Sequence, residues 1–254
     1  MLAITRKNKI KEIIIEKKSI TVSELSNTFN VTEETIRRDL QQLEKEGFLK
    51  RIYGGAYIDE SVQSDVSVNL RENILVKDKE IIAKECVPFI KDGDSIFLDA
   101  STTSFYIATK ITKKNITVIT NSLKIATKLS NSSNIKLLLI GGLYDRHSMS
   151  FLGASVQQDM KRYFVDKAFI SCRSVHMKFG ITDSNDQQAE IRRIAIEHSN
   201  QTFLVVDHTK LDKTSFSIIS PLSSVNTMVV NKKLSKEWIA LLEELDIELI
   251  QPDR

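Results

Sequence analysis

The clearest hydrophobic pattern of the chain changes its period once, near residue 47. Ile36, Leu40 and Leu43 stand at i, i+4 and i+7, which places them on one stripe of a helix. Gly47 suits the position just past the end of that helix. Residues 48–53 (Phe-Leu-Lys-Arg-Ile-Tyr) then alternate as a strand does, and a Gly-Gly pair follows them. The pattern therefore predicts a helix that runs directly into a small β-ribbon.

A second helix is predicted immediately before the first. Residues 21–29 begin with Thr-Val-Ser-Glu, which has the spacing of a capping box, so we expect a short helix there with Asn30 in the turn after it. Thr32 can cap the next helix, and Glu33 and Glu34 would lie in its first turn, where the helix dipole favours acids. With an amphipathic helix at the N-terminus, these elements form a winged helix-turn-helix, whose second helix enters the major groove of DNA.

Two arginines on the predicted recognition helix differ in placement. Arg38 lies nearly opposite the apolar stripe and is expected to face the groove, where an arginine can read a guanine edge. Arg37 lies at the flank and is better placed for a phosphate. The alternative to a DNA-binding domain is a small helical protein-interaction module whose charged residues only face solvent. The residues predicted to contact operator DNA are Thr32, Glu33, Thr35, Arg37, Arg38, Gln42, Lys50, Arg51 and Tyr53.

Beyond residue 76, short apolar strands alternate with amphipathic stretches. The first three strands recur at roughly 20-residue spacing, which is typical of βαβ units with a parallel sheet. We therefore predict a winged helix-turn-helix domain at 1–56, a linker at 57–75 that becomes a helix, and an α/β domain at 76–254. Strands are predicted at residues 95–98, 116–120, 135–140, 168–171, 202–206, 227–230 and 247–250, and helices at 77–90, 105–111, 123–129, 156–163, 187–198 and 236–244.

Polar residues follow the predicted strands, at the edge where open parallel sheets bind ligands. Asp99 and a run of hydroxyls precede a helix, and hydroxyls with backbone N–H groups at a helix N-terminus suit a phosphate. Each feature also has a structural explanation: the Ser/Thr run as a helix cap, the Gly pair as a tight turn, Asp183 as a turn residue, and Arg173 and Lys210 as surface cations. The residues predicted to bind an effector are Asp99, Ser101, Thr102, Thr103, Ser104, Asn121, Ser122, Gly141, Gly142, Arg173, Asp183 and Lys210.

The charge of the chain lies in its N-terminal part. Residues 1–56 carry 11 Lys and Arg against 8 Asp and Glu, whereas the remainder carries 25 of each, so the net charge of +3 falls on the predicted DNA-binding part. Two cysteines fit a reducing cytoplasm, and neither a secretory leader nor an apolar run of about 20 residues is present. The four histidines lack metal-ligand spacing, and no P-loop or complete G-x-G-x-x-G occurs. We therefore expect a cytoplasmic protein without a membrane partner, metal or cofactor.

The segment from Val31 to Ala56, with its Thr-Ile-Arg-Arg-Asp-Leu helix and its Arg-Ile-Tyr-Gly-Gly-Ala wing, resembles the DeoR family of bacterial sugar-responsive transcription regulators. Thr-Asn-Ser at 120–122, Gly-Gly at 141–142 and Asp-His-Thr-Lys at 207–210 are similar to motifs of that family's sensor half. That half resembles the sugar-phosphate isomerase and CoA-transferase fold. The resemblance implies a phosphorylated sugar as effector, with Ser101, Thr102, Thr103 and Lys210 at its phosphate and Asp183 toward its hydroxyls.

Two departures from the family pattern bear on catalysis. Ala100-Ser101 replaces the small residue and glycine common in the first loop, so the backbone there is less free. Gln188 stands before Ala189, where many relatives have Glu, and an isomerase needs a positioned carboxylate to move a proton. Asp99, Asp183 and Asp207 can still supply one. Binding without turnover is nevertheless the favoured interpretation.

The sequence thus predicts a repressor of a sugar-catabolic operon that binds operator DNA as a homo-oligomer and responds to a sugar phosphate. The alternatives are a sugar-phosphate isomerase with an accessory DNA-binding domain and a ligand-independent interaction module. Which sugar binds, the sign of its effect, the operator sequence and the number of subunits do not follow from the sequence.

Overall fold

The computed structural model describes residues 1–58 and 68–252. Two compact units divide the chain, an N-terminal unit from Met1 to Val76 and a C-terminal unit from Lys77 to Arg254. The predicted linker at 57–75 falls largely on residues 59–67, outside the described residues, and its division of the chain stays a prediction. Tyr57, at its start, belongs to a strand, and a helix, α5 (Val68–Glu72), lies near its end.

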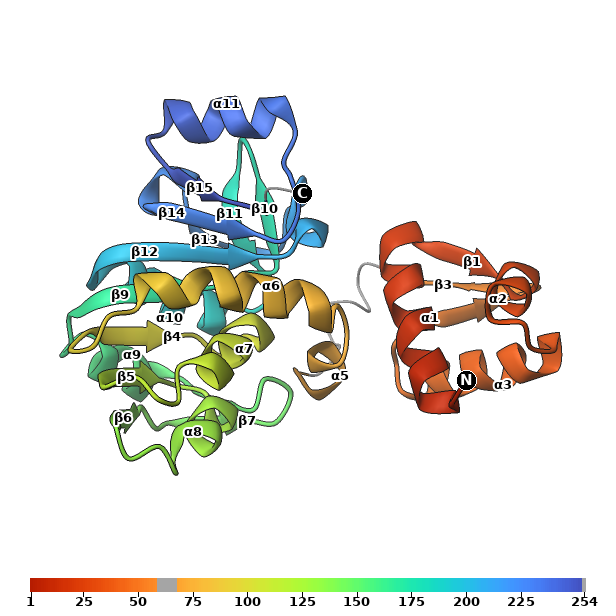
Figure 1. The fold of residues 1–254 in the computed structure, drawn as a ribbon, viewed down its shortest axis with the longest axis horizontal. Coiled ribbons are helices and arrows are strands. Elements are labelled where there is room, and N and C mark those ends of the chain that lie inside the picture. The colour runs from red at the N-terminus through yellow and green to blue at the C-terminus, as the bar shows by residue number, and fades with distance from the viewer. Residues whose placement is uncertain (59–67, 253–254) are drawn as a thin grey trace. The chain divides into compact units, whose positions relative to one another are not determined.

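The N-terminal unit contains the predicted helix-turn-helix and wing (Figure 1). The capping box is confirmed, because Thr21 caps α2 and exchanges hydrogen bonds with Glu24. Asn30 adopts the left-handed conformation in the turn, at a φ of 50°. The helices are α1 (Ala3–Lys17), α2 (Val22–Phe29) and α3 (Glu33–Lys45), and the strands β1 (Ser19–Thr21), β2 (Lys50–Ile52) and β3 (Gly55–Tyr57) pair in the order β1-β3-β2.

The predicted strand at 48–53 is too long at both ends, because β2 covers only Lys50–Ile52 and Tyr53 lies in the turn after it. Phe48 and Leu49 are buried in the core of the N-terminal unit, beside Ile36, Leu40 and Leu43 of α3. Both consecutive side chains point into the core instead of alternating between two faces of a strand, so the ribbon begins only at Lys50.

Two glycines of the wing are required for different reasons, Gly54 by its positive φ of 78° and Gly55 by a close contact. A Cβ on Gly55 would lie 2.5 Å from the carbonyl oxygen of Ile20 on the neighbouring strand β1. This close approach of two backbones fixes the wing against the rest of the unit.

The C-terminal unit is built on a seven-stranded parallel sheet, in the order β15-β14-β12-β9-β4-β5-β6. All seven strands were predicted from the sequence, and the apolar residues of the five inner strands are buried, as in a parallel sheet that is covered on both faces. Their bounds are β4 (Ser95–Leu98), β5 (Ile116–Thr120), β6 (Ile135–Leu139), β9 (Val165–Ile170), β12 (Ser199–Val206), β14 (Thr227–Val230) and β15 (Glu248–Ile250).

Helices cover both faces of this sheet (Figure 1). One core joins the strand residues Ile96, Leu98 and Val205 to α6 (Val76–Cys86), α7 (Thr102–Lys110) and α8 (Leu123–Leu129). The other joins the alternate strand positions, such as Phe97 and Leu204, to α9 (Ala154–Met160), α10 (Asp186–Glu197) and α11 (Lys236–Glu244). The α/β fold that the sequence predicts is therefore confirmed, and the structure shows that it has three layers.

Several short antiparallel elements were not predicted. A hairpin forms from β7 (Leu143–Asp145) and β8 (Ser150–Leu152), and a small sheet forms from β10 (Ser174–His176), β11 (Gly180–Asp183) and β13 (Ser217–Ser220). The 3-10 turns η1 (Val87–Phe89), η2 (His208–Lys210) and η3 (Leu222–Ser224) complete the unit. Within the described residues, no helix has the length and apolar character needed to cross a membrane.

Candidate functional site

The recognition helix α3 exposes the two arginines that the sequence selected. Its N-cap Thr32 accepts a hydrogen bond from the backbone N–H of Thr35 at 3.3 Å. The Arg38 side chain is 77% exposed and the Arg37 side chain 51%. Each pairs with the acid one turn before it, Arg37 Nη2 with Glu33 at 2.7 Å and Arg38 Nε with Glu34 at 3.2 Å. Exposed pairs of this kind are worth little, so DNA phosphates can replace the acids at small cost.

A buried ion pair holds α3 in place. Asp39 lies on the inner side of α3, and its carboxylate binds the Arg6 guanidinium of α1, with Nε to Oδ2 at 2.5 Å. Both side chains are 8% exposed. The sequence interpretation gave Asp39 no role, although a carboxylate beside an apolar stripe needs a buried partner.

The wing residues divide into two kinds. Arg51 donates from its backbone and its guanidinium to Glu44 of α3, at 2.9 and 2.7 Å, so it fastens the wing to the helix. Tyr53 is fully exposed, and Lys50 and Gln42 also face solvent. These positions stay predictions as DNA contacts.

In the C-terminal unit, the polar residues that directly follow the parallel strands lie at one edge of the sheet. We call this the carboxyl edge: the segments that directly follow β4, β5, β6, β9 and β12. The register of neighbouring strands aligns their ends, with Leu98 beside Phe169 and beside Thr120. The predicted effector residues after these strands are thereby gathered at the same edge.

The hydroxyl run at 101–104 belongs to a helix rather than to a loop. The predicted helix at 105–111 begins earlier, because Ser101 caps α7 and its Oγ accepts from the Ser104 N–H at 3.0 Å. Ser104 is fully buried and donates to Asp99 at 2.6 Å. The hydroxyls of Thr102 and Thr103 make no hydrogen bond to any residue of 1–58 or 68–252. Of this run, Thr102 and Thr103 therefore have free donors for a ligand.

Asp99 is the most completely bonded carboxylate of the edge. It is 1% exposed, and its two oxygens accept from Ser104 Oγ, from the backbone N–H groups of Ser101 and Ser171, and from Arg192. As a direct sugar contact Asp99 stays a prediction, but these four donors favour a positioning role.

Arg192 was missed by the sequence interpretation. It lies on α10, is buried, and binds Asp99 through Nε at 2.7 Å and Asp183 of β11 through Nη1 at 2.6 Å. We call these three residues the Arg192 triad. Burial would lower the pKa of Arg192, but the charges of Asp183 and Asp99 outweigh burial and raise the pKa. The guanidinium is therefore permanently charged and holds the main sheet and the small sheet together.

Further cations surround the triad. Burial lowers the pKa of Arg173, although Asp183 and Asp207 oppose the shift. Burial would raise the pKa of Asp207, yet the charges of Lys210 and Lys79 and the hydrogen bond from Thr209 lower it. Lys79 of α6 is buried, which the sequence did not suggest.

Neutral groups line the other end of the edge. Asn121 donates to the carbonyl oxygen of Phe151 at 3.0 Å, while its own Oδ1 is buried and accepts no hydrogen bond from the part of the chain that the structure describes. Ser122 caps α8. Gly142 packs tightly, since a Cβ there would lie 2.5 Å from a methyl group of Val156. Gly141 has open space around it.

Gln188 lies one helical turn before Arg192, and both side chains are on the buried side of α10. Its Nε2 donates to Ser150 Oγ at 2.9 Å. The signal for both residues was available in the sequence, because they occupy the buried stripe of an amphipathic helix, where a polar residue needs a polar partner. Among the described residues, no group of three or more His, Cys, Asp or Glu side chains could hold a metal ion.

Comparison with known proteins agrees with this architecture. Residues 6–62 match the DeoR-like helix-turn-helix domain, and residues 75–232 match the DeoR C terminal sensor domain. The HTH-type transcriptional regulator YulB of Bacillus subtilis is 41% identical over 98% of this chain and 96% of its own length. The HTH-type transcriptional repressor GlcR of Bacillus subtilis is 30% identical over 91% of this chain and 89% of its own.

A solved structure, ribose 5-phosphate isomerase A from Methanocaldococcus jannaschii, matches 52% of this chain and 53% of its own at 19% identity and a TM-score of 0.39. At that level the likeness does not bear on activity. The two family models and the relatives that match over nearly the whole length decide the classification. The chain belongs to the DeoR family of helix-turn-helix transcriptional regulators.

Proposed function

We propose that this regulator represses a sugar-catabolic operon and that a phosphorylated sugar, bound at the carboxyl edge, controls its affinity for operator DNA. The N-terminal unit reads the operator through α3 and the wing, and the chain binds as a homo-oligomer. The sugar phosphate acts through its different affinities for the DNA-competent and DNA-incompetent forms. GlcR, a relative named as a repressor, supports the sign of regulation.

One observation carries the effector proposal: the charge of the carboxyl edge. Four cations (Arg173, Arg192, Lys79 and Lys210) lie with three carboxylates (Asp99, Asp183 and Asp207). Arg192 pairs with Asp99 and Asp183, the charges of Asp183 and Asp207 act on the pKa of Arg173, and those of Lys210 and Lys79 lower the pKa of Asp207. The cluster is buried or half-buried, so its surplus positive charge is weakly screened. An anionic group such as a phosphate balances that surplus.

The same contacts favour binding without turnover. Proton transfer needs a carboxylate that is free to accept. Asp99 and Asp183 are held by Arg192, and Asp207 accepts from Thr209. Assaying isomer formation from pentose and hexose phosphates tests the enzyme alternative, and turnover would refute a purely regulatory role.

The effector can be found through the single tryptophan of the chain. Trp238 is buried in the core of the C-terminal unit, so its fluorescence reports the unfolding of that unit. We expect one sugar phosphate to raise the thermal midpoint, whereas the matching free sugar and inorganic phosphate raise it far less. Equal shifts from the sugar and its phosphate would contradict the anion site.

Two substitutions separate a ligand site from a structural role. Lys210→Ala should lose the ligand-induced shift while keeping its fold and DNA affinity, and Thr102→Val should weaken binding less because it removes one neutral donor. Lys233→Ala, at an exposed lysine of the same unit, is the control. A normal ligand response in Lys210→Ala would refute this placement of the phosphate.

Fluorescence anisotropy with the operator tests the DNA interface. If Arg38 reads a guanine, Arg38→Ala should cost about 1–3 kcal/mol and relax preference at one base pair. Arg37→Ala should weaken all sequences alike and reduce the salt dependence. Arg162→Ala serves as control, because Arg162 is an exposed arginine of the C-terminal unit that also pairs with an acid. Unchanged affinity in both α3 variants would remove this helix from the interface.

A further inference from the structure

We propose that His208 Nε2 and Lys232 Nζ form a second anion subsite, which takes a phosphate group through both donors. We call this pair the His208 subsite. It lies where β12 and β14 end, apart from the Arg192 triad. The subsite deepens the proposed function and rests on it for the nature of the ligand: the phosphate is a second one on the sugar effector or free inorganic phosphate.

A buried asparagine builds the subsite. β12 and β14 are neighbouring parallel strands in which Val206 lies beside Val230, so the segments that follow them leave the sheet side by side. Asn231 is only 4% exposed, and its Oδ1 accepts from the backbone N–H of His208 at 2.8 Å. His208 is half-buried and Lys232 is exposed. The ring is therefore held in place, and solvent can reach the lysine beside it.

The hydrogen bonds of Asn231 decide which ring nitrogen of His208 carries the proton. A backbone N–H only donates, so Oδ1 is the amide atom that faces it and Nδ2 faces the ring. Nδ2 lies 3.1 Å from Nδ1 and also only donates. Nδ1 must then accept, and the neutral ring carries its proton on Nε2.

This tautomer sets two donors against each other. The Nε2–H group lies 3.0 Å from Lys232 Nζ, and an ammonium has no acceptor. Turning the Asn231 amide around would free Nε2 to accept, but would place Nδ2 at 2.8 Å from the backbone N–H, which is again two donors. The backbone N–H is fixed, whereas the lysine is a flexible side chain. An oxyanion that accepts from both Nε2–H and Nζ resolves the conflict, and the charged donor strengthens its binding.

The subsite is distinct from the phosphate contact proposed for Lys210. His208 and Lys210 belong to the same 3-10 turn, η2, in which successive side chains point about 120° apart. The charge of Lys210 acts on the buried Asp207, whereas the His208 ring faces Asn231. The two cations thus serve different positions along the carboxyl edge.

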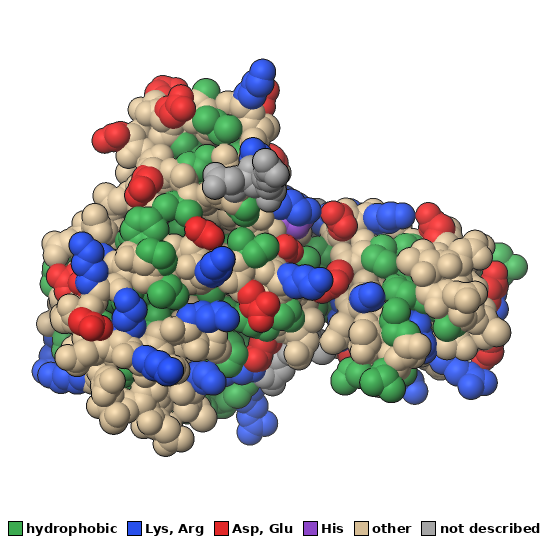
Figure 2. Space-filling model, viewed as in Figure 1, with side chains coloured by type: hydrophobic (Ala, Val, Ile, Leu, Met, Phe, Trp, Pro, Cys, Tyr) green, Lys and Arg blue, Asp and Glu red, His purple; other side chains and the backbone are tan. Residues whose placement is uncertain are grey.

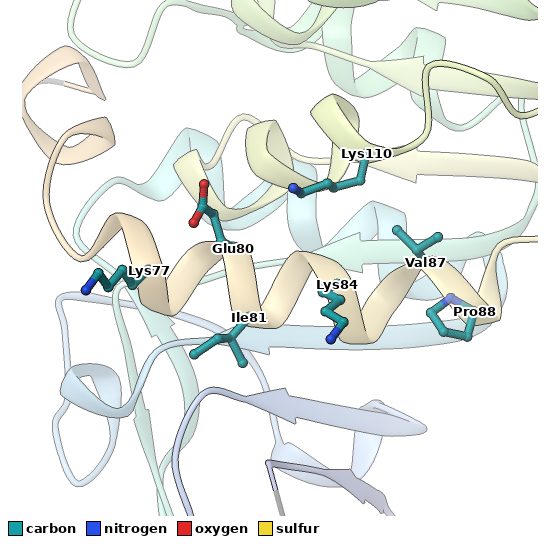
Figure 3. Close-up of a pocket in the computed structure, with 7 residues that line it drawn as sticks. All are labelled: Lys77, Glu80, Ile81, Lys84, Val87, Pro88 and Lys110. Carbon is teal, nitrogen blue, oxygen red and sulfur yellow. The ribbon is translucent and has the colours of Figure 1, made fainter.

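Positive charge alone does not single out a phosphate site on this unit. Figure 2 shows basic side chains over much of the C-terminal unit, with acidic ones among them. Figure 3 shows three lysines, Lys77, Lys84 and Lys110, spread along a groove on α6. All three are exposed, and none bonds to a buried polar side chain of the described residues. His208 differs because Asn231 fixes its ring and its tautomer.

The first test determines the tautomer of His208 in the full chain. Long-range ¹H–¹⁵N spectra show which ring nitrogen is protonated, and His208→Gln identifies its signals among the four histidines. We expect the proton on Nε2, and a saturable change of the Nε2 signal when inorganic phosphate replaces chloride at constant ionic strength. A proton on Nδ1, or no change with phosphate, would overturn the subsite.

The second test measures phosphate binding through the thermal midpoint, followed by Trp238 fluorescence. Lys210→Ala removes the other proposed phosphate contact, and inorganic phosphate should still raise the midpoint of this variant. Adding Lys232→Gln or His208→Gln should weaken phosphate binding at least about tenfold, because each removes one donor to a charged group. Lys233→Gln, at the adjacent exposed lysine, is the matched control and should keep the response. Circular dichroism checks that each variant is folded.

The source of the phosphate is tested with fructose 1,6-bisphosphate and fructose 6-phosphate. If the effector supplies it, the bisphosphate raises the wild-type midpoint more than the monophosphate does, and Lys232→Gln removes the difference. If free phosphate supplies it, the two sugars act alike, and inorganic phosphate adds to the shift of each. Both results support the subsite.

The outcomes separate the subsite from the proposed function. If Lys232→Gln and His208→Gln keep the full phosphate response while Lys210→Ala loses the shift with a sugar phosphate, the subsite is wrong and the proposed function stands. An equal loss in Lys233→Gln and Lys232→Gln also overturns the subsite, because only general charge is then at work. If phosphate acts through Lys232 but no sugar phosphate shifts the midpoint, the subsite stands and the proposed effector is wrong.

Discussion

Replacing Arg192 by methionine should destabilise the C-terminal unit by about 3–5 kcal/mol, because it leaves two carboxylates buried without their shared cation. The Asp99 and Asp183 side chains are 1% and 10% exposed, so water cannot compensate for the lost guanidinium. For a domain of this size, about 1 kcal/mol corresponds to roughly 2–4 °C. The thermal midpoint should therefore fall by roughly 6–20 °C.

Trp238 fluorescence measures this transition without contribution from the N-terminal unit, which has no tryptophan. Arg192→Lys should fall between the wild type and the methionine variant, because an ammonium keeps the charge but not the fork that bridges two carboxylates. Arg162→Met, at an exposed arginine, should change the midpoint by only a degree or two, because surface substitutions are usually within about 0.5 kcal/mol.

A double-mutant cycle decides whether the loss comes from uncompensated charge. Asp183→Asn combined with Arg192→Met should cost less than the sum of the two single losses, since one stranded carboxylate has been neutralised. Strict additivity, or a midpoint in Arg192→Met that matches Arg162→Met, would refute the electrostatic account of the triad.

Two further predictions concern other parts of the chain. Gly55→Ala should cost about 1–3 kcal/mol in the N-terminal unit and weaken operator binding, because its Cβ would lie 2.5 Å from the Ile20 carbonyl oxygen; calorimetry and anisotropy measure both. Burial would raise the pKa of Asp207, but the charge of Lys210 is among the effects that hold that pKa below its ordinary value of about 3.9. Its stabilising contribution is therefore present above about pH 4 and lost as the pH falls through the folded-state pKa, and Asp207→Asn should flatten the acid limb of the Trp238 stability profile.

The elements that the sequence predicted share a physical basis. The five inner strands of the main sheet have buried apolar residues, and each of the seven strands appears in the sequence as a short apolar run. The N-terminal helices carry explicit start and stop signals, such as the Thr21 capping box and Gly47, which has a φ of 69°. These elements depend mainly on residues that are close in sequence, so the sequence alone is enough to predict them.

The missed strands depend on partners that are distant in sequence. β10 and β13 are only three and four residues long, and each pairs with β11. Strands this short hold too few residues to show an alternating pattern. In addition, the pairing of β13 with β11 contains a register shift near Ile181. The early start of α7 is a different error, because a run of hydroxyls fits both a phosphate loop and a capped first turn until Ser101 is seen as the cap.

The centre of the candidate site shows the same limit. The sequence interpretation selected Asp99 and Lys210 at the ends of predicted strands and Asp183 in a later segment, and it took each carboxylate for a possible ligand contact. Their mutual partner, Arg192, comes from a helix that follows β11, and only the folded chain brings that guanidinium between them.

Gln188 completes this argument, because it lies one turn before Arg192 on the buried side of α10. A glutamate, which the family resemblance leads one to expect there, would add a negative charge one helical turn from Arg192 and so reduce the net positive charge of this region. Glutamine keeps the hydrogen bond to Ser150 and adds no charge. A proton-transferring enzyme gains from the extra carboxylate, whereas a site that only holds a phosphate gains from its absence. The departure at residue 188 and the charge of the carboxyl edge therefore favour the same proposal, an anion sensor that releases its ligand unchanged.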